Sequence, residues 1–121
     1  MKTVLLVDDS ATILMMQKMV LKATNYKVIV AHNGEEGVRK ATAERPDLIL
    51  MDVIMPKMTG FEACRKLREQ DVTKDIPIIM VTTRGEPLNV EEGFQSGCTD
   101  YVTKPIDSFE LINKLKDQLG E

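Results

Sequence analysis

Short, continuous apolar runs alternate along the chain with longer segments of mixed polarity. Within each run apolar residues follow one another without polar alternation, a pattern typical of strands that are covered on both faces of a sheet. Valine and isoleucine, which favour strands, are frequent in these runs. The runs occupy residues 3–7, 28–31, 48–51 and 78–81, with a weaker one at 101–102. They predict five strands.

The segments that follow these runs are predicted to be helices. Three of them repeat apolar residues every three or four positions, as the buried face of a helix requires. The repeats consist of Ile13, Met16 and Val20; of Phe61, Cys64 and Leu67; and of Leu111, Ile112, Leu115 and Leu119.

Residues that favour helix ends support these assignments. Thr59 with Glu62 matches a capping box, in which the two residues bond each other's backbone N–H groups. Pro87 fits the first turn of the fourth helix, and Gly97 fits its end. Further start signals are Ser10, Asn33 with Glu36, and Asp107 with Glu110.

Five strands alternating with five helices predict an α/β domain with a parallel sheet and right-handed crossovers. The chain has 121 residues and 43% hydrophobic content, enough for one core and too short for a second domain. Repeats, low-complexity stretches and linkers are absent from the sequence. We therefore expect one domain spanning residues 1–121.

Composition narrows the classes of function. A net charge of -3 argues against a protein that coats nucleic acid, which needs a concentrated basic face. No apolar stretch approaches the roughly 20 residues that span a bilayer, and the first residues lead directly into a strand. We therefore expect a cytoplasmic protein without membrane insertion. Cys64 and Cys98 lack the spacing of a zinc site or redox pair and are expected to be free thiols.

Polar residues gather where the predicted strands end. Asp8 and Asp9 follow the first strand, Asp52 follows the third, Thr82 ends the fourth and Lys104 follows the fifth. In an open parallel sheet the carboxyl ends of the strands form one edge, and ligands bind there. The sequence therefore predicts that three carboxylates, a hydroxyl and an ammonium group converge.

Such a cluster suits a divalent cation and a phosphoryl group. Carboxylates brought together repel one another unless a cation neutralises them, and oxygen ligands without His or Cys favour a hard cation. A site with few carboxylates and several waters favours Mg²⁺ over Ca²⁺. Asp52 is the best nucleophile for phosphorus, because it stands alone on the strand beside the acidic pair. Asp9 is then a direct ligand of the metal, and Asp8 acts through water. Lys104 would supply positive charge and Thr82 a hydrogen bond to the transferred group.

Four stretches of the chain resemble the receiver domains of two-component response regulators, especially their stand-alone chemotaxis-regulator form. They are VLLVDDS at 4–10, LILMDVIMPKMTG at 48–60, IIMVTT at 78–83 and DYVTKP at 100–105. The resemblance covers essentially the whole chain. It implies a doubly wound, flavodoxin-like (βα)5 fold with strand order 2-1-3-4-5.

The resemblance also implies a role for each site residue. Asp52 would be the phosphoacceptor, Asp8 and Asp9 would organise Mg²⁺, and the backbone carbonyl of Ile54 would complete the metal shell. Thr82 and Lys104 would contact the phosphoryl group, and Tyr101 would be the aromatic switch. Lys104-Pro105 resembles the position of a cis peptide bond in this family, and X-Pro bonds adopt cis at little cost.

Two further positions, Ile54 and Arg84, resemble those that tune the access of water to the acyl phosphate in this family. Ile54 offers no group to orient an attacking water, and Arg84 would lie over the phosphoryl oxygens. We therefore expect slower autodephosphorylation than in relatives with Asn and Glu at these positions.

The implied function is that of a single-domain response regulator rather than an enzyme. A histidine kinase would phosphorylate Asp52, and phosphorylation would change the surface formed by the fourth helix, the fifth strand and the fifth helix. Because no DNA-binding or catalytic segment follows the last helix, the expected output is binding to a separate downstream protein. Val90, Tyr101 and Lys114 are candidate contacts for that protein. A phosphatase is a further candidate partner. The expected state is a monomer, with a phosphorylation-dependent dimer left open.

Alternatives remain at this stage. Chemotaxis or motility signalling and a phosphorelay intermediate look alike in the sequence. A haloacid-dehalogenase-type phosphatase also uses an aspartyl phosphate, but it carries a second Asp where this chain has Ile54. A flavodoxin-like electron carrier needs a phosphate-binding loop where Asp8 and Asp9 would repel the phosphate. A phosphate-independent receiver is disfavoured by the complete set of five site residues.

Two groups of residues away from the site carry weaker expectations. Met15, Met16 and Met19 in the first helix are interpreted as core or as a pliable interface, because the thioether side chain adapts to irregular surfaces. The cationic residues of the third helix, Arg65, Lys66 and Arg68, are interpreted as a solvated face.

Overall fold

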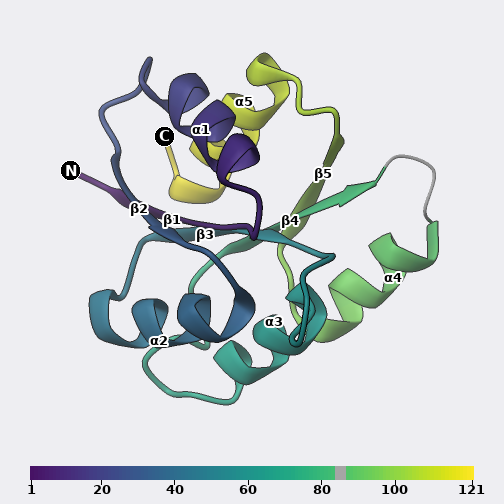
Figure 1. Ribbon diagram of the computed structural model, residues 1–121. Coiled ribbons are helices and arrows are strands. Elements are labelled where there is room, and N and C mark those ends of the chain that lie inside the picture. Colours follow the sequence, from purple (N-terminus) through teal and green to yellow (C-terminus); the bar gives the residue numbers. More distant parts are fainter. Residues whose placement is uncertain (84–86) are drawn as a thin grey trace.

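The computed structural model describes the backbone of residues 1–83 and 87–121 and the side chains of residues 1–82 and 91–121. Within these residues, five strands alternate with five helices (Figure 1). The strands are β1 (Thr3–Val7), β2 (Lys27–Ala31), β3 (Leu48–Asp52), β4 (Ile78–Thr83) and β5 (Asp100–Lys104). The helices are α1 (Ala11–Leu21), α2 (Gly34–Glu44), α3 (Gly60–Arg68), α4 (Pro87–Ser96) and α5 (Ser108–Leu119).

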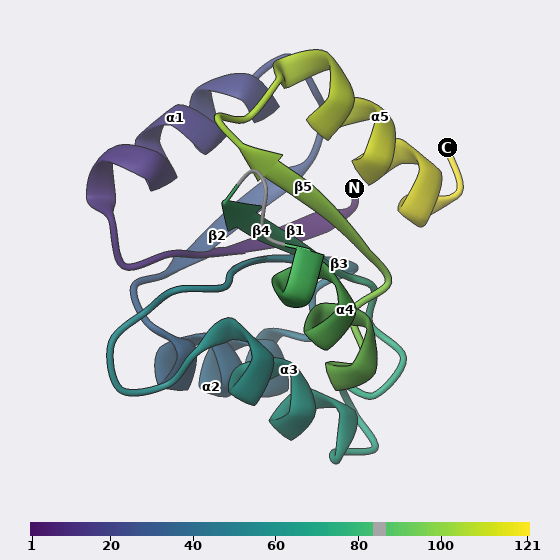
Figure 2. The same cartoon turned by 90° about the vertical axis from the view of Figure 1, so that its right-hand side faces the viewer.

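The strands form one parallel sheet in the order β2-β1-β3-β4-β5. Helices α1 and α5 cover one face, and α2, α3 and α4 cover the other (Figures 1 and 2). The predicted α/β fold and strand order are therefore confirmed. All five predicted strands form, and the weakest of them extends to Asp100–Lys104.

The two faces of the sheet explain the continuous apolar runs. Alternate strand residues point to opposite faces, and both faces are covered by helices. Beneath α1 and α5 lie Val4, Leu6, Leu48, Leu50 and Ile79, packed with Leu14, Leu21, Leu111 and Leu115. The opposite face buries Leu5, Val7, Ile49, Met51 and Ile78 with Ala41, Phe61 and Leu67.

The predicted helix starts are confirmed in detail. Thr59 and Glu62 form both bonds of a capping box at the start of α3. Asn33 and Asp107 accept backbone N–H groups without the reciprocal bond, and Ser10 accepts from Ile13 N. Helix α4 ends before Gly97, whose φ of 108° lies in the left-handed region that favours glycine. The sequence signals therefore locate these helix ends correctly.

The buried face of α1 differs from the predicted one. Leu14, Gln17 and Leu21 are buried, whereas Ile13 and Val20 are half-buried and Met16 is exposed. The segment ATILMMQKMVL is apolar on nearly every side, so its periodicity does not select one face. The exposed fractions of Met15, Met16 and Met19 are 58%, 56% and 63%, so the core interpretation of these residues is wrong.

Arg68 also differs from the expectation of a solvated side chain. Its Nε donates to the carbonyl of Gly97 at 2.9 Å. Its Nη1 donates to the carbonyls of Lys74 at 3.0 Å and Ile76 at 2.8 Å. The guanidinium group therefore joins the end of α3 to the connections before β4 and β5, because it presents several donors in one plane.

The two cysteines and the lengths of the helices bear on the remaining predictions from the sequence. Cys64 and Cys98 are free and buried, and burial raises the pKa of Cys98 to about 12. In the part of the chain that the structure describes, no helix has the length and apolar character needed to cross a membrane.

Candidate functional site

Three acidic residues meet at the carboxyl edge of the sheet. Asp52 is the last residue of β3, and Asp8 and Asp9 directly follow β1, the strand that pairs with β3. Each offers a carboxylate oxygen, and these oxygens lie within 4.8 Å of one another. Asp8 and Asp52 are buried, with exposed fractions of 1% and 3%, whereas Asp9 is exposed. The predicted convergence of the carboxylates is confirmed.

Asp8 carries an incompletely satisfied carboxylate. Its Oδ1 accepts the backbone N–H of Ser10 at 2.9 Å, which fixes the side chain beside the start of α1. Its Oδ2 is buried, and no described residue donates a hydrogen bond to it. Burial raises the pKa of the Asp8 carboxyl, and the nearby Asp52 carboxylate adds to this effect. A bound cation would satisfy this oxygen.

Asp52 pairs with the ammonium group at the end of β5. Its Oδ1 lies 3.0 Å from Lys104 Nζ, and the Lys104 side chain is one-third exposed. The pKa of the Asp52 carboxyl is nevertheless raised, because the effect of burial exceeds the opposing effect of Lys104. The ion pair therefore offsets only part of the cost of burying this charge.

Thr82 lies on β4 one residue beyond Val81, the partner of Asp52 in the sheet. Its side chain is 2% exposed, and its Oγ1 has no hydrogen-bond partner among the described residues. An unpaired buried hydroxyl typically costs about 1–3 kcal/mol. Thr82 thus has an unpaired hydroxyl at the same edge of the sheet as the carboxylates, and this hydroxyl is able to donate a hydrogen bond to a bound group.

The segment between Asp52 and α3 is held by close backbone contacts. The Gly60 N–H donates to the carbonyl of Val53 at 2.8 Å, and the Met58 N–H donates to that of Pro56 at 2.8 Å. Between the latter two, Lys57 adopts a φ of 70°, in the left-handed region that non-glycine residues rarely enter. The resulting tight turn returns the chain against the end of β3.

Sequence reasoning missed the part that Gly60 plays in this turn. A Cβ at Gly60 would overlap the backbone carbonyl oxygen of Asp52 and would lie 3.0 Å from Val53 Cα. The Thr-Gly pair at 59–60 by itself indicates only a helix start. The additional signal is the short distance in sequence between the end of β3 and this cap.

Tyr101 lies on β5, half-buried against the core beneath α3 and α4. Its ring meets Phe94 of α4 edge-on, with ring centroids 5.9 Å apart. Lys114 Nζ of α5 lies 5.3 Å from the Tyr101 ring centroid and 3.0 Å from Asp100 Oδ1. These contacts hold the ring between the two helices, in the conformation that the structure describes.

The remaining predicted site residues have different positions. The Ile54 side chain is 66% exposed, between the buried Val53 and Met55. Lys104-Pro105 is a cis peptide bond, as predicted. Arg84 lies outside the described residues, and so does the side chain of Val90.

The donor set of the acidic cluster fits a hard divalent cation. It consists of carboxylate oxygens, and the described residues of the cluster include neither His nor Cys. Mg²⁺ is usually bound through one or two carboxylates and keeps several water ligands, and this cluster offers that number together with one more carboxylate. The buried Oδ2 of Asp8 has no partner among the described residues, and burial raises the pKa of Asp8 and Asp52, so a cation bound here would offset the cost of burying these charges.

Comparison with known proteins gives one consistent result. The family described as "Response regulator receiver domain" matches residues 4–116. The chain is 38% identical to Protein PilH of Pseudomonas aeruginosa over 120 residues, which cover 99% of each protein. It is 41% identical to the transcriptional regulatory protein ResD of Bacillus subtilis, covering 93% of this chain and 46% of ResD. The chain thus spans about half the length of ResD.

Solved structures agree. The chemotaxis protein CheY4 of Vibrio cholerae superposes with a TM-score of 0.92 at 39% identity, covering 98% of this chain and 99% of that one. The receiver domain of the sensor histidine kinase PA1611 from Pseudomonas aeruginosa superposes with a TM-score of 0.91 at 32% identity, covering 99% and 98% of the two chains. That structure holds a magnesium ion coordinated in the active site cleft.

Proposed function

Because the chain belongs to the response regulator receiver family, we propose that Asp52 accepts a phosphoryl group from the phosphohistidine of a histidine kinase. Phosphorylation then switches binding to a downstream protein. One observation carries this proposal: a buried carboxylate at the end of β3 lies beside two further carboxylates and 3.0 Å from an ammonium group. This arrangement can stabilise the anionic group that is transferred.

The transfer forms one bond and breaks another. An Asp52 carboxylate oxygen bonds to phosphorus, the phosphorus–nitrogen bond of the donor breaks, and the imidazole keeps the electron pair. Lys104 already contacts Asp52 Oδ1 and can shift to a phosphoryl oxygen as charge leaves the carboxylate. The buried Thr82 hydroxyl supplies a donor that no other described residue uses.

We assign the metal site to Asp8, Asp9 and Asp52, with the Ile54 backbone carbonyl as a further ligand. Mg²⁺ bound there would neutralise the negative charge that the carboxylates and the phosphoryl oxygens bring together. The chain's own contribution is positional, because the Ser10 N–H fixes Asp8 and the end of β3 fixes Asp52. The magnesium ion in the PA1611 receiver domain supports this assignment.

The output surface is proposed to be that of α4, β5 and α5. A phosphoryl group adds about -1.5 to -2 charge, and a Thr82 hydroxyl drawn towards it would open space beside Tyr101. Phe94 and Lys114 contact the Tyr101 ring from α4 and α5, so a change in its rotamer changes both contacts. The Phe94 side chain is 47% exposed and available to a partner.

The similarity to a chemotaxis protein over nearly the full length of both chains supports chemotaxis as the pathway. Return of the phosphoryl group to a second histidine-containing protein would instead identify a phosphorelay intermediate. We propose that the protein acts in the cytoplasm, because histidine kinases draw on cytoplasmic ATP. We also propose that it is a monomer before phosphorylation.

Phosphoryl transfer can be tested without the kinase. Incubated with Mg²⁺ and acetyl phosphate, the wild type should gain the mass of one phosphoryl group, because the small donor reaches Asp52 directly. Asp52→Asn should gain none, since the amide is a poor nucleophile. The measurement is intact-protein mass spectrometry at neutral pH.

Asp75→Asn is the matched control, because Asp75 is exposed and lies in the connection before β4. It should be phosphorylated like the wild type, and EDTA should prevent the gain in both. Equal mass gains in Asp52→Asn and the wild type would reject Asp52 as the acceptor.

Ile54→Asn should accelerate the loss of the phosphoryl group. Ile54 lies two residues after Asp52 in the chain, is 66% exposed and has no polar group to orient water. An amide there would supply one, and a tenfold faster decay corresponds to about 1.4 kcal/mol of transition-state stabilisation. Ile54→Val, which stays apolar, should decay like the wild type. Mass spectrometry of the purified phosphoproteins measures how fast each loses its phosphoryl group. Equal decay rates for Ile54→Asn and the wild type would contradict the prediction.

A further inference from the structure

The backbone between α4 and β5, residues 97–99, is held by hydrogen bonds to two other parts of the fold. The carbonyl of Gly97 accepts a hydrogen bond of 2.9 Å from Nε of Arg68, the last residue of α3. The Thr99 N–H donates to the carbonyl of Ile78 at 2.8 Å. The Thr99 hydroxyl donates to the same carbonyl at 3.0 Å and accepts the Ile78 N–H at 3.1 Å. The connection is therefore tied to both α3 and the start of β4.

Arg68 is itself anchored to the connection that precedes β4. Its Nη1 lies 3.0 Å from the carbonyl oxygen of Lys74 and 2.8 Å from that of Ile76. A Cβ at Gly97 would lie only 2.7 Å from Arg68 Cγ, so the close approach requires glycine. Because the guanidinium group presents its donors in one rigid plane, it holds the two connections at a fixed separation.

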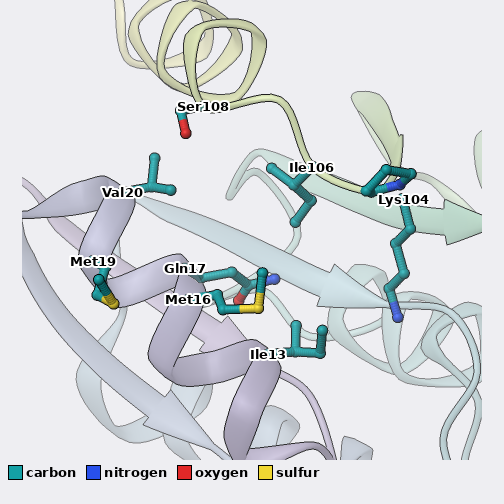
Figure 3. A pocket seen from close by; sticks show the side chains of 9 residues that line it. Ile13, Met16, Gln17, Met19, Val20, Lys104, Ile106 and Ser108 are labelled. Carbon is teal, nitrogen blue, oxygen red and sulfur yellow. The ribbon is translucent and has the colours of Figure 1, made fainter.

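The strand β5 is also held at its other end. Nζ of Lys104, its last residue, lies 3.0 Å from Asp52 Oδ1, and Figure 3 shows this side chain extending from the end of the strand. Tyr101 is the second residue of β5 and therefore lies between the two attachments. Its ring meets Phe94 of α4 edge-on, with ring centroids 5.9 Å apart. The two rings thus flank, in sequence, the connection that α3 holds.

We propose that Arg68 is a positioning residue for the switch: it fixes the backbone between Phe94 and Tyr101, so that phosphorylation changes their contact through the Tyr101 side chain alone. A free connection would let the end of α4 shift relative to β5, and the rings would then separate without a signal. With the connection fixed, their contact depends on the Tyr101 rotamer. The regulatory part of this inference rests on the proposed phosphorylation of Asp52, whereas the backbone role of Arg68 does not.

Fluorine NMR of protein labelled with 3-fluorotyrosine tests this role, because the chain has two tyrosines, Tyr26 and Tyr101. In the unphosphorylated protein, Arg68→Gln should move and broaden the Tyr101 signal, since the ring then packs against several positions of α4. Tyr26 packs on the opposite face of the sheet and serves as an internal reference whose signal should not change. In the wild type, phosphorylation with Mg²⁺ and acetyl phosphate should move the Tyr101 signal.

Hydrogen exchange measured by mass spectrometry tests the backbone directly, in the peptide that covers residues 97–99. Its amides should exchange at least about tenfold faster in Arg68→Gln than in the wild type, the factor expected for the loss of one hydrogen bond to a charged group. In the wild type, phosphorylation should leave this exchange unchanged while the Tyr101 signal moves. A residue with only a general structural role would not produce this separation between backbone and ring.

Arg65→Gln is the matched control. Arg65 also lies on α3 and reaches α4, where it pairs with Glu92 at 3.6 Å, but the two side chains are about half exposed. Such an exposed ion pair contributes little, so this variant should match the wild type in both measurements. Arg68→Lys keeps the charge without the planar set of donors and should give an intermediate effect, which measures the same role if Arg68→Gln folds poorly.

Three results would overturn the proposal. They are equal Tyr101 signals in Arg68→Gln and the wild type, equal effects of Arg65→Gln and Arg68→Gln, and faster exchange at residues 97–99 when the wild type is phosphorylated. If acetyl phosphate adds no phosphoryl mass to the wild type, the proposed function of Asp52 fails. The comparison of the two arginine variants in the unphosphorylated protein then still decides whether Arg68 fixes the connection.

Discussion

Gly60→Ala will strongly destabilise the protein and abolish its phosphorylation. The added Cβ would overlap the backbone carbonyl oxygen of Asp52 and lie 3.0 Å from the Asp52 carbonyl carbon and from Val53 Cα. These are backbone atoms of a buried strand and its continuation, so no side-chain rotation relieves the overlap. The hydrogen bond from Gly60 N to Val53 O is 2.8 Å long, and it must break or distort as these two segments of the backbone move apart.

The expected loss of folding stability is large for the addition of a single methyl group. Overpacking a dense interior costs up to about 3 kcal/mol and occasionally more. For a domain of this size, that corresponds to a fall in melting temperature of roughly 10 °C. Thermal unfolding followed by circular dichroism measures the loss of stability. Mass spectrometry after acetyl phosphate treatment measures the loss of phosphorylation, which is expected because the displaced backbone carries the Asp52 side chain.

Gly93→Ala is the matched control for this substitution. Gly93 lies inside α4, where a Cβ would meet Cys98 Sγ at 3.3 Å and the flexible Met80 side chain at 3.6 Å. Alanine favours a helix interior over glycine by about 1 kcal/mol, which offsets this contact. The control should keep the wild-type stability within about 1 kcal/mol. Equal destabilisation by the two variants would show that the turn after β3 has no special importance.

Asp8→Asn should raise the stability of the metal-free protein and weaken its binding of Mg²⁺. In the metal-free protein the variant should be more stable than the wild type by about 1–2 kcal/mol, because it removes a buried charge whose Oδ2 has no described partner. The amide keeps an oxygen to accept the Ser10 N–H. With Mg²⁺ at 100 times its dissociation constant, the wild type should gain about 2.7 kcal/mol and the variant much less.

The pH dependence of this gain follows from the raised pKa of Asp8. A carboxyl whose folded-state pKa exceeds its ordinary value of 3.8 binds more protons when folded, so metal-free stability falls as pH rises through the folded pKa. The advantage of Asp8→Asn should therefore be full above the folded pKa and should vanish below 3.8. Urea unfolding at several pH values, without metal, measures it.

Asp9→Asn is the control for Asp8→Asn, because Asp9 is exposed and its charge costs little in the folded state. It should lose the response to Mg²⁺ without the gain in metal-free stability. A metal-free Asp8→Asn protein less stable than the wild type would contradict the account of the buried charge.

The sequence is sufficient to predict the layers of the fold because both faces of the sheet are buried. Continuous apolar runs of four or five residues favour buried strands over helices, which need longer segments, and residues 48–51 and 78–81 are accordingly buried in β3 and β4. The capping box at Thr59 and Glu62 is likewise a local property, and local properties are readable from sequence. The strand order comes from the family resemblance, since no pattern in one chain encodes it.

The buried face of α1 could not be predicted in the same way. Its residues are apolar on nearly every side, so only packing against the sheet distinguishes Leu14 and Leu21 from Met15 and Met19. The prediction for Arg68 is wrong for a similar reason, because three of the carbonyls it contacts, in Lys74, Ile76 and Gly97, come from two other connections. Both depend on contacts that form only when the folded chain brings a helix against other segments.

The candidate site is predicted more completely than the helix faces. Each of its carboxylates stands at a strand end, so a single topological rule brings Asp8, Asp9 and Asp52 together. The ion pair of Asp52 and Lys104 fits the same rule. The unpaired oxygens of Asp8 and Thr82 could not be predicted, because they depend on which donors the folded backbone leaves within reach. The chemical roles of these residues stay predictions.

The exposed thioethers of α1 have a chemical consequence for the protein in air or under oxidative stress. Hydrogen peroxide converts accessible methionine to the polar sulfoxide, and it reaches Met15, Met16 and Met19 while Met51 and Met80 stay shielded inside the sheet layers. Mild oxidation therefore leaves the interior intact and makes one side of the first helix hydrophilic. Methionine sulfoxide reductases, acting on those accessible positions, would restore the original surface.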